Sequence, residues 1–103
     1  MKVVAIVQAR LGSSRLPGKC LLAVRDRPLL SHVLERVQAI AGVDQVVLAT
    51  TWNERDTALV SVAALHHLPT WRGSEQDVLG RFRDAARWRA ADVLALILAT
   101  NCL

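Results

Sequence analysis

Two uninterrupted apolar segments constrain the fold of this chain more than any other feature. The first spans Val3 to Val7 and is mostly β-branched, and the second spans Val93 to Leu98. A strand with one solvated face alternates apolar and polar residues, whereas a strand buried on both faces of a parallel sheet is apolar throughout. We therefore predict that both segments are strands of a parallel sheet, with the first in a central position.

Further strands and a helix are predicted between these two segments. Pro28 opens a stretch in which apolar residues recur at helical spacing as far as Ile40, and Gly42 follows as a stop. A short apolar stretch at residues 46–49 predicts a second strand, and Thr70 and Trp71 are expected to form a short third strand.

Two more helices are predicted from capping patterns. One begins with Asn53 and Asp56 and ends after Leu68, and the other begins with Ser74 and Asp77. The second of these carries four arginines that we expect on a solvated face: Arg81, Arg83, Arg87 and Arg89.

The alternation of strands and helices predicts the α/β class, as a Rossmann-like three-layer parallel sheet. Right-handed crossovers place helices on both faces of the sheet and give the strand order 3-2-1-4, counted along the chain. A length of 103 residues fits one compact domain. In such sheets ligands bind at the carboxyl ends of the strands, where residues 8–19 follow the first strand.

The positive charge of the chain is concentrated near its N-terminus. Residues 1–27 contain six lysines and arginines against one aspartate, whereas the other 76 residues contain seven basic and eight acidic residues. A basic character spread over the whole surface would favour nucleic acid or an anionic membrane. One basic segment favours a small anion with several charges, such as a polyphosphate.

The loop at residues 8–19 differs from two common phosphate-binding loops. The dinucleotide fingerprint requires three glycines, but only Gly12 and Gly18 occur here. A P-loop has four residues between its glycines and a serine or threonine after its lysine. Here five residues separate the glycines, and Cys20 follows Lys19. Neither loop type fits.

The same loop nevertheless carries groups that bind polyphosphates. Residues 12–14 offer flexible backbone whose amides can point at phosphate oxygens, and Arg10, Arg15 and Lys19 supply cations around it. This combination suits a nucleoside triphosphate.

The sequence of this loop, QARLGSSRLPGK, resembles the signature of nucleotidyltransferases that activate sugars. The resemblance is to the cytidylyltransferase family of spore coat polysaccharide biosynthesis proteins and acylneuraminate cytidylyltransferases. Two later blocks follow in the family's order and extend the resemblance over the whole chain. They are Ala49-Thr50-Thr51 with Asn53 and Asp56, and residues 72–81 with the sequence RGSEQDVLGR.

The resemblance implies that a sugar oxygen attacks the α-phosphate of CTP and that pyrophosphate leaves, as a step in surface polysaccharide biosynthesis. It also implies an incomplete nucleotide-diphospho-sugar transferase fold, Mg²⁺ as cofactor, and Arg15 and Lys19 as catalytic residues. Such chemistry depends on positioning and charge neutralisation. The implied triphosphate ligands are Arg10, Arg15 and Lys19, with Ala9, Gly12 and Ser13 beside them. The implied residues of the base and ribose side are Thr50, Gly73, Ser74 and Asp77.

The chain departs from the family pattern in two ways. Asn101 stands where the family has an acidic Mg²⁺ ligand, and a neutral amide oxygen is a poorer partner for a hard cation. The chain also ends where the family continues into the acceptor-sugar pocket, so we expect residues 1–103 to be a single nucleotide-binding domain truncated at its C-terminus. We therefore expect CTP binding with little or no turnover, and self-association through an uncovered strand at residues 93–98.

Other functions and roles stay open beside this one. The chain could be a catalytically inactive nucleotide-binding fragment or a basic nucleic-acid-binding domain, although the latter is disfavoured because no strand offers stacking aromatics. Asp77 fits a helix cap as well as a nucleotide ligand. Trp71 and Trp88 are predicted to pack rather than to stack on a base.

The sequence also predicts the cellular location of the chain. Its longest uncharged apolar run is far short of the roughly 20 residues of a membrane helix, and no signal peptide precedes the charged Arg10. We expect a cytoplasmic protein with no membrane partner.

Overall fold

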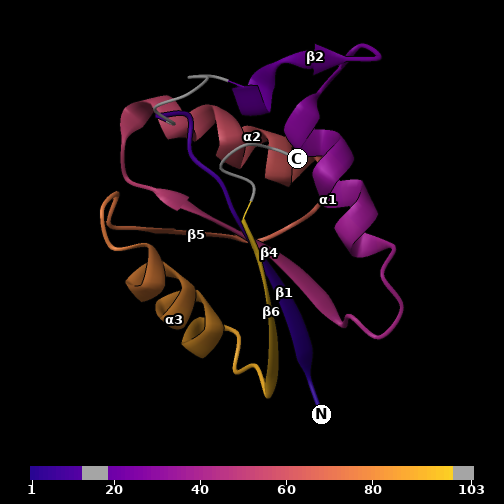
Figure 1. Ribbon diagram of the computed structural model, residues 1–103, viewed down its shortest axis with the longest axis vertical. Coiled ribbons are helices and arrows are strands. Elements are labelled where there is room, and N and C mark those ends of the chain that lie inside the picture. Colours follow the sequence, from indigo (N-terminus) through magenta and orange to yellow (C-terminus); the bar gives the residue numbers. More distant parts are fainter. Residues whose placement is uncertain (13–18, 99–103) are drawn as a thin grey trace.

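The computed structural model describes residues 1–12 and 19–98. The strands of its main sheet are β1 (Val3–Gln8), β4 (Gln45–Thr51), β5 (Thr70–Gly73) and β6 (Val93–Leu98). They pair in the order β5-β4-β1-β6, and every pairing is parallel (Figure 1). The α/β class is confirmed, and the observed order is the one that the sequence predicts. The apolar first strand lies between two neighbours.

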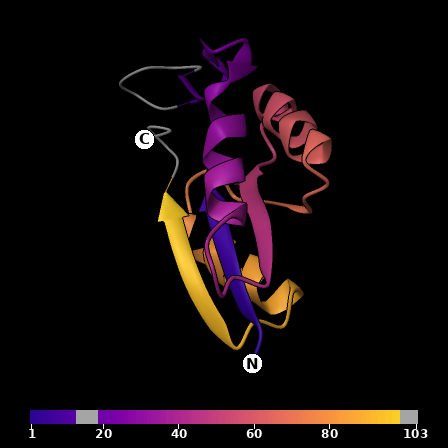
Figure 2. The ribbon, with the colours of Figure 1, turned by 90° about the vertical axis from the view of Figure 1, so that its right-hand side faces the viewer.

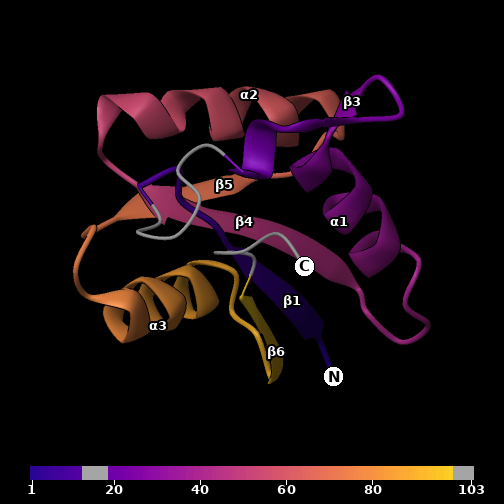
Figure 3. The same ribbon diagram turned by 45° about the horizontal axis from the view of Figure 1, so that its top comes forward.

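Helices cover both faces of this sheet. The three α-helices are α1 (Leu29–Gln38), α2 (Thr57–Leu65) and α3 (Val78–Trp88). Figure 3 shows α1 and α2 on one face and α3 on the other. On β1, Ala5 and Val7 join the core under α1 and α2, whereas Val4 and Ile6 join the core above α3. The uninterrupted apolar sequence of β1 therefore serves two cores at once, which makes the domain three-layered.

A short antiparallel hairpin precedes α1 and was not predicted. It consists of β2 (Ala23–Val24) and β3 (Arg27–Pro28). Its turn residues Arg25 and Asp26 have φ angles of 52° and 66°. Such turns usually carry Asn or Gly, so the sequence offers no recognisable turn pattern here.

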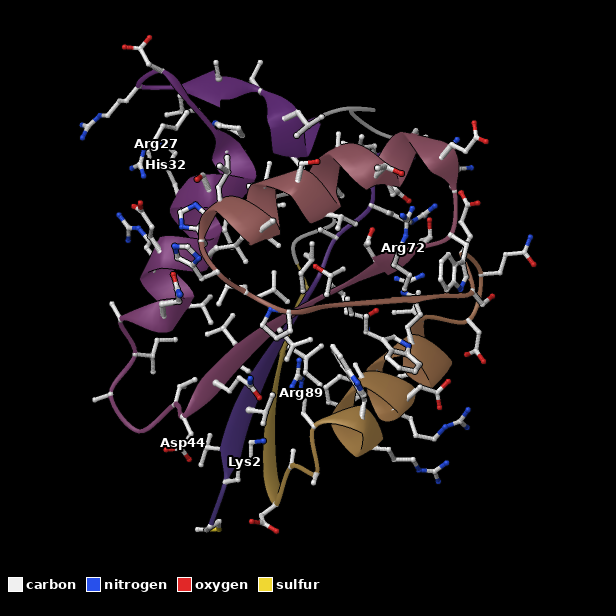
Figure 4. The ribbon with its side chains drawn as sticks, turned by 180° about the vertical axis from the view of Figure 1, so that it is seen from behind. Lys2, Arg27, His32, Asp44, Arg72 and Arg89 are labelled. Atoms are coloured by element: carbon white, nitrogen blue, oxygen red, sulfur yellow. The ribbon has the colours of Figure 1, made fainter. Side chains whose placement is uncertain are left out.

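His32 on α1 holds the hairpin in place. Its Nε2 donates to the carbonyl of Val24 at 2.7 Å, and its Nδ1 accepts from the guanidinium of Arg27 at 3.1 Å. Arg27 and His32 lie side by side in Figure 4. The hairpin is thus anchored to the helix that follows it.

The second helix is shorter than predicted. α2 ends at Leu65 rather than Leu68, because His67 adopts a left-handed φ of 57°. The amides of His67 and Leu68 then donate to the carbonyls of Ala64 and Ala63, each at 3.0 Å, which closes a Schellman motif. In the part of the chain that the structure describes, no helix has the length and apolar character needed to cross a membrane.

Candidate functional site

The parallel strands bring three loops to one edge of the sheet, which we call the carboxyl edge. Residues 9–12 follow β1, residues 52–56 follow β4, and residues 74–77 follow β5. The backbone joins the loop after β4 to the end of β5, since the Trp52 amide donates to the carbonyl of Gly73 at 3.2 Å. In Figure 1 this edge lies at the end of the sheet opposite the N-terminus. The loop that the sequence singles out therefore begins beside the two other motif blocks.

Asp56 fixes the start of the β1 loop. Its carboxylate is fully buried, at 0% exposure, at the end of the 3₁₀-helix η2 (Glu54–Asp56). Oδ1 accepts from the Leu11 amide at 2.8 Å, and Oδ2 accepts from the hydroxyl of Thr51. The predicted capping role is wrong for Asp56, because its side chain makes no cap bond and reaches across to the loop after β1 instead. Asn53 makes the cap, accepting from the Arg55 amide at 3.0 Å.

Gly12 lies against the guanidinium of Arg55. A Cβ at Gly12 would come within 2.1 Å of Arg55 Nη2, so a side chain at this position would displace the guanidinium. Arg55 in turn pairs with Glu75, to which Asn53 also donates at 3.3 Å. Arg10 is half-buried, and its Nη1 donates to the Gly12 carbonyl at 3.4 Å. Arg10 and Gly12 are thus placed together, and Ala9 is buried beneath them.

The structure leaves part of the predicted triphosphate side undescribed. Ser13 and Arg15 lie outside the described residues, as does Asn101. Lys19 begins the 3₁₀-helix η1 (Lys19–Leu21), but its side chain belongs to the undescribed part. Their roles stay predictions.

Two of the residues predicted for the base side shape the loop after β5. The Ser74 hydroxyl accepts from the amides of Gln76 and Asp77, each at 3.2 Å. Asp77 Oδ1 accepts from the Gly80 amide at 2.9 Å and so caps α3. The capping role of Asp77 is confirmed. Both side chains are exposed, so the remaining lone pairs of their oxygens face solvent.

Thr50 does not join the other predicted residues. It follows Val46 and Leu48 at the two-residue period of a strand, which places it on the α1 and α2 side. The residue is fully buried, and its hydroxyl has no hydrogen-bond partner among the residues that the structure describes.

Arg72 is a site residue that sequence reasoning assigned no role. Its Nε donates to the Thr51 carbonyl at 2.7 Å, and its Nη2 donates to the Asn53 carbonyl at 3.0 Å. The guanidinium lies 5.4 Å from the ring centroid of Trp52, whose side chain is 71% exposed. Figure 4 shows Arg72 near the end of the sheet, close to the start of α2. It ties β5 to the loop after β4.

The prediction of a solvated arginine face on α3 is wrong for Arg81. Arg83 and Arg87 are exposed, but Arg81 is 1% exposed and points under the carboxyl edge. Burial lowers the pKa of Arg81 below its ordinary value, and the nearby charge of Arg10 lowers the pKa further. Because a guanidinium stays protonated in proteins, the result is a buried cation.

The two tryptophans of this region lie together. The ring centroids of Trp71 and Trp88 are 5.5 Å apart, and Trp71 packs against the core beside α3. The prediction that Trp71 is a packing residue is confirmed.

Among residues 1–12 and 19–98, no three His, Cys, Asp or Glu side chains gather as a metal site. Asn101, the residue predicted to face Mg²⁺, carries a neutral amide. The described donor set therefore does not fit a protein-held Mg²⁺.

Sequence comparison relates the chain to known proteins. A family model for cytidylyltransferases matches residues 4–101. The uncharacterized protein MJ1063 of Methanocaldococcus jannaschii is 40% identical over 103 residues, covering 100% of this chain and 42% of the relative. The spore coat polysaccharide biosynthesis protein SpsF of Bacillus subtilis is 38% identical over 84 residues, covering 78% of this chain and 35% of that protein. The chain thus spans less than half the length of these relatives.

Two solved structures are also similar to this chain. A cytidylyltransferase from Leptospira borgpetersenii has a TM-score of 0.90 at 35% identity, covering 95% of this chain and 41% of that one. A CMP:2-keto-3-deoxy-manno-octonic acid synthetase, solved in complex with CTP, has a TM-score of 0.78 at 28% identity, covering 95% and 40%. Both share the arrangement of sheet and helices described above.

Proposed function

Because the chain belongs to the cytidylyltransferase family, we propose that it binds CTP at the carboxyl edge and serves the activation of a sugar in surface polysaccharide biosynthesis. In that reaction a sugar oxygen attacks the α-phosphate and pyrophosphate leaves. The observation that carries the proposal is the buried Asp56, which accepts from the Leu11 amide and so fixes the start of the basic loop at the carboxyl edge.

The triphosphate side of the proposed site neutralises charge. Arg10, Arg15 and Lys19 would pair with phosphate oxygens, and the amides of Gly12 and Ser13 would donate to them. Arg15 and Lys19 are proposed as the catalytic residues, because cations placed where charge develops stabilise the transition state. The bond from the Leu11 amide to Asp56, which anchors the start of the loop, supports this role.

The nucleoside side is proposed on the loop after β5. Gly73 ends β5 and Ser74 and Asp77 lie in this loop, where the exposed oxygens of the two side chains can accept from ribose hydroxyls or base amines. Thr50 is proposed only as part of the floor, because its side chain is fully buried. Mg²⁺ would accompany the triphosphate, since this ion is commonly held through substrate phosphates.

A second candidate function is nucleotide binding without turnover. Asn101 favours it, because the family resemblance places a carboxylate at this position. Replacing Asn101 by Asp should raise Mg²⁺-dependent pyrophosphate release from CTP in the presence of an acidic sugar, while the parent stays at background. A parent rate near one per second, within the ordinary range of enzymes, would exclude this candidate.

Calorimetric titration with CTP tests the main proposal. The parent chain should bind, and Arg15→Ala or Lys19→Ala should each weaken binding by at least about tenfold, because each removes a charge-assisted contact worth about 1.5 to 3 kcal/mol. Arg36→Ala is the matched control, since Arg36 is exposed on α1 and lies outside the site loops. Equal binding by all three variants would place the site elsewhere. Tight, steeply salt-dependent binding of single-stranded RNA would instead favour the nucleic-acid alternative.

A further inference from the structure

Arg81 is the largest side chain that is fully buried among the described residues. It projects from α3 toward the carboxyl edge, beneath the loops that follow β1 and β5. Burying a cation is costly unless hydrogen bonds compensate it. The partners of Arg81 therefore indicate what its burial achieves.

These partners lie on both sides of the proposed site. Nε donates to Gln8 Oε1 at 2.9 Å, and Nη1 donates to the carbonyls of Ser74 at 2.8 Å and Glu75 at 3.2 Å. Gln8 is itself fixed, because its Nε2 donates to the Val78 carbonyl at 3.0 Å. One side chain thus joins the last residue of β1 to the loop after β5.

Gly73 leaves room for this connection. A Cβ at Gly73 would lie 2.9 Å from Arg81 Cγ, so the arginine stem passes directly against the backbone at the end of β5. A larger residue at position 73 would push the stem away from both loops.

The burial of Arg81 carries a free-energy cost. Nη2 of Arg81 is buried without a hydrogen-bond partner in the part of the chain that the structure describes. An unpaired buried donor costs free energy, and apolar side chains often replace buried ions without loss of stability. A gain other than stability therefore accounts better for a guanidinium at this position.

We propose that Arg81 is a positioning residue that sets the nucleoside-side loop, residues 74–77, relative to the end of β1, where the triphosphate-side loop, residues 9–19, starts. This inference rests on the proposed function. A nucleoside triphosphate must contact both loops at once, whereas inorganic triphosphate needs only the basic loop. Loss of the bridge should therefore weaken CTP binding far more than triphosphate binding.

The test compares Arg81→Lys with the parent in calorimetric titrations of CTP and of inorganic triphosphate. Lysine keeps the charge but cannot reach Gln8 and the two carbonyls together. We expect the Kd for CTP to rise about tenfold and the Kd for triphosphate to change by less than about twofold. Arg83→Lys, on an exposed turn of the same helix, should change neither value. An equal rise for both ligands, or no rise for either, would overturn the proposal.

Hydrogen exchange provides a readout without any ligand. The amides of Gln76 and Asp77, which donate to Ser74, should exchange about tenfold faster in Arg81→Lys, while amides of the β1 and β4 pairing keep their parent rates. If the parent binds neither ligand, the proposed function fails, and unchanged exchange at these two amides would overturn the bridge as well.

A second variant covers the case in which Arg81→Lys does not fold, as judged by circular dichroism. Gln8→Met removes the acceptor of Arg81 Nε and keeps the length of the side chain. It should give the same difference between CTP and triphosphate. Equal effects on the two ligands would contradict the positioning role.

Discussion

At the scale of single residues, Asp56 is the motif residue that holds two parts of the candidate site together. Its two oxygens satisfy the Leu11 amide and the Thr51 hydroxyl, so a buried carboxylate joins the ends of β1 and β4. Hydrogen bonds to a charged acceptor are stronger than neutral ones. The start of the basic loop is therefore rigid even though the loop is polar.

Replacing Asp56 by Ala should lower the free energy of unfolding by about 3 kcal/mol, because two buried donors lose their acceptor. Urea denaturation measures the change. Asp84→Ala is the control, since Asp84 forms an exposed pair with Arg83 and its loss should cost less than about 1 kcal/mol. Equal losses for the two variants would show that the buried carboxylate adds nothing.

The sequence predicted the role of a residue correctly where its hydrogen-bond partner is only a few positions away in the chain. The capping contact of Asp77 to Gly80 spans three residues, and the sequence pattern predicted it. Arg81 and Asp56 bind partners 73 and 45 residues away, and no periodicity along one helix reports such contacts. Arg81 was therefore assigned to a solvated face, and Asp56 to a cap.

At the scale of elements, the pattern of apolar residues predicted most of the fold. The uninterrupted run at β1 predicted a central strand because only a strand with a core on both sides needs no polar residue. The β2–β3 hairpin escaped prediction because its strands have two residues each and its turn lacks Asn or Gly. Its stability comes from contacts with α1.

The stability that the ion pair between Arg27 and Glu35 contributes should depend on pH. Arg27 on β3 pairs with Glu35 on α1, and the hydrogen bond from Arg27 lowers the Glu35 pKa below its ordinary value of 4.5. A depressed carboxyl pKa contributes stability above the ordinary value and loses it as the pH falls through the lowered pKa. The melting temperature of the parent should therefore fall more between about pH 5 and about pH 3 than that of Glu35→Gln.

Thermal melts at low salt check this prediction, because the pair is exposed and therefore screened. High salt should reduce the difference between the two proteins. Parallel pH profiles of the two melting temperatures at low salt would show that the Arg27–Glu35 pair does not stabilise the fold.

At the scale of the whole molecule, β6 lies at the edge of the sheet (Figure 2). It pairs with β1 and, among the strands that the structure describes, with no other. An unpaired edge strand can add a strand from another chain. We therefore expect a second copy of the chain to pair along β6.

Light scattering after gel filtration should show the mean mass rising with concentration toward twice the 11.3 kDa of one chain. Leu96→Lys should suppress this rise, because a charge on an edge strand opposes pairing. A constant monomer mass at every concentration would exclude association through β6.

Nuclear magnetic resonance mapping of CTP on the labelled chain tests directly whether the carboxyl edge binds the nucleotide. We predict that CTP shifts the amide resonances of residues 9–12, of the basic loop up to Lys19, and of residues 74–77. The amides of the β2–β3 hairpin and of the opposite end of the sheet should not shift. Saturable shifts confined to those other regions, or no shifts at all, would contradict the claim.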